Sequence, residues 1–165
     1  MYRTPPTPRP YVVSAFNGEV VAYARATGQT LWHWRAQGSY ARTRVQPTHV
    51  QMEGSRVFVL VAVYDDVGVL SGQTVSAQLN ALDDSTGRVL WTHTLTRGQR
   101  FPNFAATLIV DAGQVLFSHL DVIMAIAAES GQVQWSRARE RDHSDSFLTA
   151  IQLAVSGTTS RPSTW

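Results

Sequence analysis

The side chains that could carry out acid–base or metal chemistry in this 165-residue chain are few and scattered. None of the five histidines has the His-x-x-x-His spacing that places two ligands on one helix face. Asp142, His143 and Asp145 stand close together and offer ligands to a cation, but a polar loop is the expected role of this stretch. We therefore predict no metal site. The histidines are His33, His49, His93, His119 and His143.

Two acidic pairs, Asp65-Asp66 and Asp83-Asp84, are the other candidates. Adjacent residues of a strand point to opposite faces, so the members of each pair are poorly placed to share a proton. The chain has no glycine-rich phosphate loop and no Gly-x-Ser-x-Gly elbow. It also has no cysteine, which excludes thiol catalysis, disulfides and cysteine-ligated zinc. We predict no catalytic residue.

Composition indicates a folded domain, because hydrophobic residues make up 44% of the chain and charged residues only 16%. All 14 basic residues are arginines, scattered from Arg3 to Arg161, and the net charge is +2. A nucleic-acid-binding face would show a basic stripe instead. No apolar run approaches the roughly 20 residues of a membrane span. Residues 1–10 hold four prolines and no hydrophobic region, which predicts a flexible lead-in and no secretory signal.

The elements that must position these side chains are predicted to be short strands. β-rich runs alternate with Gly, Asn, Asp and Ser, and Asn17-Gly18 is a strong hairpin signal. The predicted strands cover residues 11–16, 20–24, 30–35, 44–52, 56–64, 76–83, 89–95, 104–113, 114–120, 122–128, 133–137 and 147–157.

Three segments, 22–32, 81–91 and 125–135, share the pattern Ala-x-x-x-x-[Thr/Ser]-Gly-x-x-x-Trp. Their glycines are 59 and 44 residues apart, and one four-stranded propeller blade takes about 40–45 residues. An enlarged hairpin at residues 64–76 accounts for the longer interval. The motif residues are Ala22, Thr27, Gly28 and Trp32, then Ala81, Asp83, Thr86, Gly87 and Trp91, then Ala125, Ser130, Gly131 and Trp135.

Each motif position has a physical reason. The glycine suits a turn with positive φ, and the preceding hydroxyl can bond the local backbone. The alanine lies on the strand before the turn and leaves room for the tryptophan on the strand after it. A sheet of this kind cannot bury both faces alone, so each indole is predicted to pack against the next sheet.

The pattern resembles the tryptophan-docking motif of PQQ-like quinoprotein β-propeller repeats, Ala-x-Asp-x-x-Thr-Gly-x-x-x-Trp. The second copy matches fully, whereas Ala24 and Ala127 replace the Asp and Ser130 replaces the third Thr. The resemblance covers roughly residues 11–156. It implies an all-β, WD40-like architecture: a partial β-propeller of about three four-stranded antiparallel blades at residues 11–157, with 158–165 as a tail. It also implies that each Trp packs on the neighbouring blade's motif turn.

Three blades are fewer than the four to eight that usually close a propeller. Two chains could pair as a homodimer with a six-bladed ring. The chain could be a segment of a longer propeller. The final strand, 147–157, could instead fold back on residues 11–35.

The resemblance implies a non-catalytic scaffold that binds a protein or peptide, and the family is often extracytoplasmic, although the compartment stays open. The expected contact element is the hairpin from Tyr64 to Ser76, with Tyr64, Val67, Val69 and Leu70. One alternative is a fragment of a PQQ-dependent alcohol or sugar dehydrogenase, which would use PQQ and calcium. The alcohol-oxidising members have a vicinal cysteine pair that this chain lacks, so we expect neither cofactor. Another alternative is a small-ligand sensor.

Overall fold

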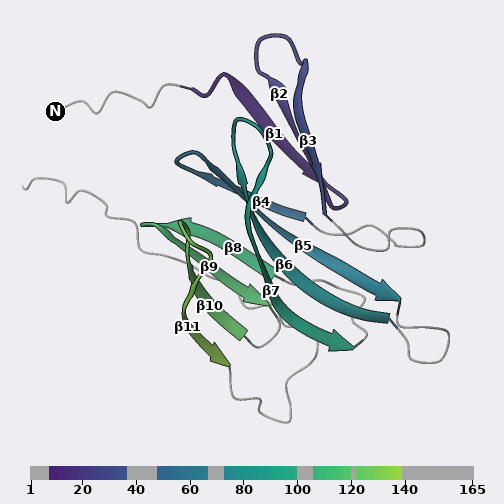
Figure 1. The fold of residues 1–165 in the computed structure, drawn as a ribbon, viewed down its shortest axis with the longest axis vertical. Coiled ribbons are helices and arrows are strands. Elements are labelled where there is room, and N and C mark those ends of the chain that lie inside the picture. Colours follow the sequence, from purple (N-terminus) through teal and green to yellow (C-terminus); the bar gives the residue numbers. More distant parts are fainter. Residues whose placement is uncertain (1–7, 37–47, 67–72, 100–105, 120–121, 139–165) are drawn as a thin grey trace, which may run out of the picture. The chain divides into compact units, whose positions relative to one another are not determined.

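The computed structural model describes residues 8–36, 48–66, 73–99, 106–119 and 122–138. These residues form strands in three antiparallel sheets, with no helix among them (Figure 1). The chain divides into two compact units, Met1–Phe104 and Ala105–Trp165. The first two sheets belong to the first unit and the third sheet to the second unit.

The first sheet has the order β1-β2-β3, with β1 at Tyr11–Phe16, β2 at Glu19–Ala24 and β3 at Thr30–Arg35. Asn17 and Gly18 connect β1 to β2 with φ angles of 52° and 79°. Two positive φ angles are those of the type I′ turn, whose twist matches that of the strands it joins. The predicted Asn-Gly hairpin is thus confirmed.

The second sheet has the order β4-β5-β6-β7. Its first strand, β4, is short and covers Thr48–Glu53. The other three are longer, with β5 at Arg56–Asp66, β6 at Gln73–Asp83 and β7 at Val89–Gln99.

The third sheet has the order β11-β10-β9-β8, and it forms the described part of the second unit. Its strands all have six residues: β8 at Ala106–Asp111, β9 at Gln114–His119, β10 at Val122–Ala127 and β11 at Val133–Ala138.

The predicted all-β class and the antiparallel sheets are confirmed. The described part of the enlarged hairpin predicted at 64–76 is regular β structure. β5 continues to Asp66 and β6 begins at Gln73, whereas the predicted strands ended at residue 64 and began at residue 76. The strand predicted at 147–157 and the tail predicted at 158–165 lie outside the described residues.

A hydrophobic core cluster of the first unit lies between the first and second sheets. Alternate side chains of each strand point to one face, so Val20 and Ala22 of β2 meet Val57 and Val59 of β5. Trp32 and Leu82 complete this buried cluster. Partly buried side chains from β1, β3 and β4 surround it: Val13, Ala15, Trp34, Val50 and Met52. Burial of these apolar surfaces holds the two sheets face to face.

Candidate functional site

The three motif turns have the same backbone geometry. Gly28, Gly87 and Gly131 have φ angles of 71°, 70° and 71°, which confirms the positive φ predicted for them. Each glycine N–H donates to the carbonyl four residues earlier, over 2.8, 2.9 and 2.9 Å in chain order. The turn is therefore a property of the motif and does not depend on the sheet that carries it.

The motif hydroxyls also bond in the same way in all three copies. The side chains of Thr27, Thr86 and Ser130 accept a hydrogen bond from the backbone N–H two residues later, over 3.3, 3.3 and 3.4 Å. These bonds hold the turn from within.

Each motif alanine faces its own tryptophan across the sheet. The register pairs are Ala22 with Trp32, Ala81 with Trp91 and Ala125 with Trp135. The register shifts directly after each alanine. The shared irregularity fixes the same offset between turn and indole in every sheet.

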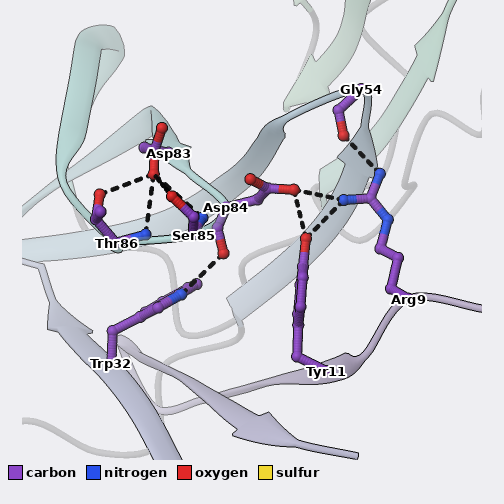
Figure 2. Close-up of polar contacts among 8 residues, drawn as sticks. All are labelled: Arg9, Tyr11, Trp32, Gly54, Asp83, Asp84, Ser85 and Thr86. Carbon is purple, nitrogen blue, oxygen red and sulfur yellow. Dashed lines mark hydrogen bonds and ion pairs between the residues drawn. The ribbon is translucent and has the colours of Figure 1, made fainter.

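Trp32 of the first sheet packs on the motif turn of the second sheet (Figure 2). A Cβ placed on Gly87 would lie 2.6 Å from Cε3 of the indole, so only glycine leaves room for the ring. The indole Nε1–H donates to the carbonyl oxygen of Asp84 over 2.9 Å. Trp32 is 8% exposed, and its one polar atom is satisfied by the same turn that covers its ring.

A polar cluster lies beside this indole, and its centre is the Asp84 carboxylate (Figure 2). Arg9 Nη1 donates to Asp84 Oδ2 over 2.6 Å and to the Tyr11 hydroxyl over 2.7 Å. The Tyr11 hydroxyl in turn donates to Asp84 Oδ2. Arg9 Nη2 reaches the Gly54 carbonyl over 2.6 Å. Burial raises the pKa of Tyr11, and the hydrogen bond to Asp84 raises it further, so the phenol stays protonated as a donor.

Asp83, the neighbouring carboxylate, serves its own turn. Its Oδ1 accepts hydrogen bonds from the hydroxyl and the backbone N–H of both Ser85 and Thr86, over 2.7 to 3.1 Å. These donors favour the charged form and lower the pKa of Asp83 to about 2. Asp83 is thus a strongly ionised turn residue, and it is poorly suited to accept a proton near neutral pH.

Sequence reasoning missed Arg9, Tyr11 and the carboxylate of Asp84 as parts of this contact. Arg9 falls in the proline-rich lead-in, and Asp84 was considered only as one member of an acidic pair. The only available signal was that Asp84 directly follows the motif aspartate, at the position whose carbonyl receives the indole N–H.

The other two motif tryptophans have different surroundings. Trp91 lies tilted against Phe58 of its own sheet, with ring centroids 6.0 Å apart and an interplanar angle of 47°. Trp135 is 40% exposed. The docking of these two indoles on a neighbouring turn stays a prediction.

Two of the histidines have surroundings that the structure describes in detail. His33 Nε2 lies 3.7 Å from a carboxylate oxygen of Glu19, on an exposed surface. Burial lowers the pKa of His49 on β4. Within the described ranges, no three His, Asp or Glu side chains come together in a way that could hold a metal ion. Asp142, His143 and Asp145 lie outside the described residues.

The predicted contact hairpin is described only in part. Tyr64 lies on β5, paired with Val75 of β6, while Val67, Val69 and Leu70 at the tip lie outside the described residues. In the part of the chain that the structure describes, no helix is long and apolar enough to cross a membrane.

Two solved structures are similar to this chain, and the first of them supports the propeller architecture. A europium-containing methanol dehydrogenase is similar over 78% of this chain and 22% of its own, with 18% identity and a TM-score of 0.51. BamB from Moraxella catarrhalis matches 76% of this chain and 48% of its own, with 13% identity and a TM-score of 0.32. The chain thus spans less than half of either structure. A search of curated proteins finds no match.

A family model described as "Outer membrane protein assembly factor BamB" matches residues 9–161. That range contains all three motif turns and every described strand. The match agrees with the β-propeller repeats expected from the motif. The chain belongs to this BamB family of PQQ-like β-propeller proteins.

Proposed function

We propose that the chain is a non-catalytic scaffold that binds a protein partner through an extension of its second sheet. The extension consists of residues 62–66, 73–77 and 95–99, and we call it the arm. The predicted contact residues Val67, Val69 and Leu70 come between the first two of these segments in the sequence and lie outside the described residues.

The arm is defined by comparing registers. Val61 pairs with Gln78 in the second sheet, and Phe16 pairs with Glu19 in the first. The two pairs are equivalent, because Gln78 and Glu19 each stand three residues before the motif alanine of their sheet. The first sheet turns at this point through Asn17 and Gly18, whereas the second sheet continues for five more residues on each strand. At about 3.3 Å per residue, the arm extends roughly 17 Å past the level where the first sheet ends.

The backbone of the arm is suited to binding an extended peptide as an additional β-strand. Residues 62–66 pair with 73–77, and β7 pairs along the other side of β6. In the described sheet β7 is the last strand, so its residues 95–99 form an edge of the arm. Such an edge offers N–H and C=O groups to which an extended peptide can add as a further strand. A register shift at Ala77/Gln78 marks the base of the arm, and bulges of this kind redirect a strand.

The polar residues of the described site support a scaffold rather than a reaction centre. The Asp83 carboxylate accepts hydrogen bonds within its own turn. The side chains of Asp84, Tyr11 and Arg9 form hydrogen bonds with one another. The family description names an assembly factor of outer membrane proteins, which also favours binding to another protein.

The second candidate is a fragment of a PQQ-dependent dehydrogenase, favoured by the similarity to the methanol dehydrogenase. Among the described residues, no three His, Asp or Glu side chains come together in a way that could hold the calcium ion. Saturable binding of PQQ with calcium, together with dye-linked oxidation of an alcohol, would support this candidate against the scaffold. A small-ligand sensor would instead show thermal stabilisation by a metabolite.

The test of the scaffold is a matched pair of proteins. In the shortened variant, Asn-Gly replaces residues 62–77, so that Val61 and Gln78 are joined by the turn that joins Phe16 to Glu19. Partners cross-linked to the intact chain at the arm are identified, purified and titrated against both proteins. We expect the shortened variant to keep its melting temperature and to bind at least about 10-fold more weakly, a difference of about 1.4 kcal/mol. Equal binding by both proteins would contradict the role of the arm.

A further inference from the structure

A buried asparagine in the second sheet has only part of its hydrogen-bonding capacity satisfied. Asn80 of β6 is 3% exposed and pairs across the sheet with Val59, a member of the core cluster between the first and second sheets. Its Oδ1 accepts a hydrogen bond from the Thr92 hydroxyl over 2.8 Å, whereas its Nδ2 has no partner among the residues that the structure describes. An unsatisfied buried donor lowers stability, so an apolar side chain would serve the core better. The amide therefore needs another explanation.

The first and third sheets have apolar residues at the equivalent position. The residue directly before the motif alanine is Val21 in the first sheet, Asn80 in the second and Met124 in the third. Val21 has no polar side-chain atom, and the thioether of Met124 is a weak acceptor. The hydrogen bond between Asn80 and Thr92 is therefore specific to the second sheet.

The second sheet also differs in its strand pairing. In all three sheets, four regular pairs lead away from the register shift at the motif alanine. The described pairing of β3 and β11 ends after these four pairs. In the second sheet, a further shift follows at Ala77/Gln78, and the strands continue into the arm. Asn80 and Thr92 form the second of the four pairs, so the buried amide lies between the two shifts of the one described sheet that has both.

The second shift inserts one extra residue into β7. β6 advances by one residue, from Gln78 to Ala77, while β7 advances by two, from Thr94 to Thr96. The residues of β7 from Thr92 to Thr94 are polar on both faces, and register is weakly specified in strands of this kind. The pattern of side chains on β7 therefore does not decide at which step the extra residue is inserted.

Another position of the extra residue would reverse the faces of the strand below the arm. If the extra residue came directly after Trp91, Asn80 would pair with His93 instead of Thr92. Because neighbouring residues of a strand point to opposite faces, His93 would then move to the face of the inter-sheet core. The hydrogen bond to Thr92 would be lost. The bond thus favours the observed arrangement over this alternative.

We propose that Asn80 is a positioning residue for the arm, because its hydrogen bond to Thr92 keeps the extra residue of β7 at the base of the arm. The position of a bulge sets where a strand changes direction, so Asn80 sets the direction of the arm. The amide lowers stability and selects one arrangement, as a buried asparagine does when it fixes the register of a coiled coil. The consequence for partner binding rests on the proposed function, whereas the pairing of β6 with β7 does not.

The experiment compares strand pairing in variants of the full chain by nuclear magnetic resonance. The wild type should give one set of amide signals for residues 92–94, with cross-strand contacts between Asn80 and Thr92. Asn80→Val copies Val21 of the first sheet and should keep or raise the melting temperature. It should also give a second set of signals, in which position 80 contacts His93.

Variants of the threonine separate the hydrogen bond from the size of the side chain. Thr92→Val keeps the shape but removes the hydroxyl, and it should also give the second set of signals. Thr92→Ser keeps the hydroxyl and should give one set. Thr94→Val is the matched control, because Thr94 is an exposed threonine two residues along the same strand, and it should also give one set.

Partner binding is a separate readout. For a partner cross-linked at the arm, the dissociation constant of Asn80→Val should rise in inverse proportion to the fraction of molecules with the wild-type pairing. One set of signals with wild-type contacts in both Asn80→Val and Thr92→Val would overturn the inference, whatever their melting temperatures. Two sets of signals with unchanged affinity would instead contradict the role of the arm and leave the inference standing, so the two can fail separately.

Discussion

The motif turns of the first and second sheets differ in their surroundings and hardly at all in their backbone. Gly28 and Gly87 share a φ near 70°, the same carbonyl bond and the same hydroxyl contact. Among the described residues an indole contacts only the second of these two turns, and the second turn also has Asp83 and Asp84. The turn is therefore set by local sequence, and docking is a separate interaction added on top of it.

Of the contacts that distinguish the second turn, the indole of Trp32 should contribute most to the free energy of unfolding. Trp32→Ala removes the ring from the core of the first unit and should lower the free energy of unfolding by about 3–5 kcal/mol. Trp32→Phe keeps an aromatic ring but loses the bond to the Asp84 carbonyl, and it should cost about 1–2 kcal/mol. Urea unfolding of both variants measures these values. A loss under 1 kcal/mol for Trp32→Ala would show that the ring does not hold the sheets together.

The glycine under the indole gives the next largest effect. Gly113→Ala introduces only the strain of a left-handed backbone, about 1–2 kcal/mol, because its Cβ meets open space. Gly87→Ala adds the collision with Trp32 and should cost a further 1–3 kcal/mol or so. Thermal or urea unfolding compares the two directly. Equal losses at the two glycines would mean that the space above Gly87 is not needed by the ring.

The polar cluster should make a smaller contribution. Arg9→Ala leaves Asp84 with Tyr11 as its remaining side-chain partner and should cost about 1 kcal/mol, since Arg9 is 35% exposed. Arg35→Ala is the matched control, because its ion pair with Glu19 is longer, at 3.4 Å, and more exposed. It should change stability by less than about 0.5 kcal/mol. A double-mutant cycle of Arg9→Ala with Asp84→Asn isolates the pair, and zero coupling would remove it from the contact.

The smallest effect concerns Asp83 and depends on pH. Its pKa of about 2 in the folded chain lies below the ordinary 3.8, so its stabilising effect is complete above about pH 4 and is lost as pH falls toward 2. Asp83→Ala reproduces the Ala24 and Ala127 of the other motifs. The stability difference between wild type and this variant should therefore shrink between pH 5 and 2.5. A constant difference across that range would contradict the bonded carboxylate.

The part of this site that was predictable from sequence is the part encoded within eleven residues. The positive φ at Gly87 and the pairing of Ala81 with Trp91 follow from a motif whose partners are near in the chain. Arg9 and Asp84 are 75 residues apart, and no local pattern links a lead-in arginine to a turn carboxylate. The contact exists because the two sheets pack face to face and bring their ends together.

The ends of two arm strands were misplaced by a few residues. The sequence predicted strands at 56–64 and 76–83, but the pairing of Asp65 with Thr74 and of Asp66 with Gln73 continues the sheet beyond them. β propensity depends on context, so residue types alone do not set where a strand ends.

The docking of Trp32 on Gly87 can be tested most directly by nuclear magnetic resonance. A Cβ on Gly87 would lie 2.6 Å from Cε3 and 2.8 Å from Cδ2 of the indole, so the α proton in that position points into the ring face. This proton should resonate well upfield of the corresponding α proton of Gly113, which faces open space, and the shift should vanish in Trp32→Leu. Matching shifts for Gly87 and Gly113 in the wild-type chain would contradict the contact.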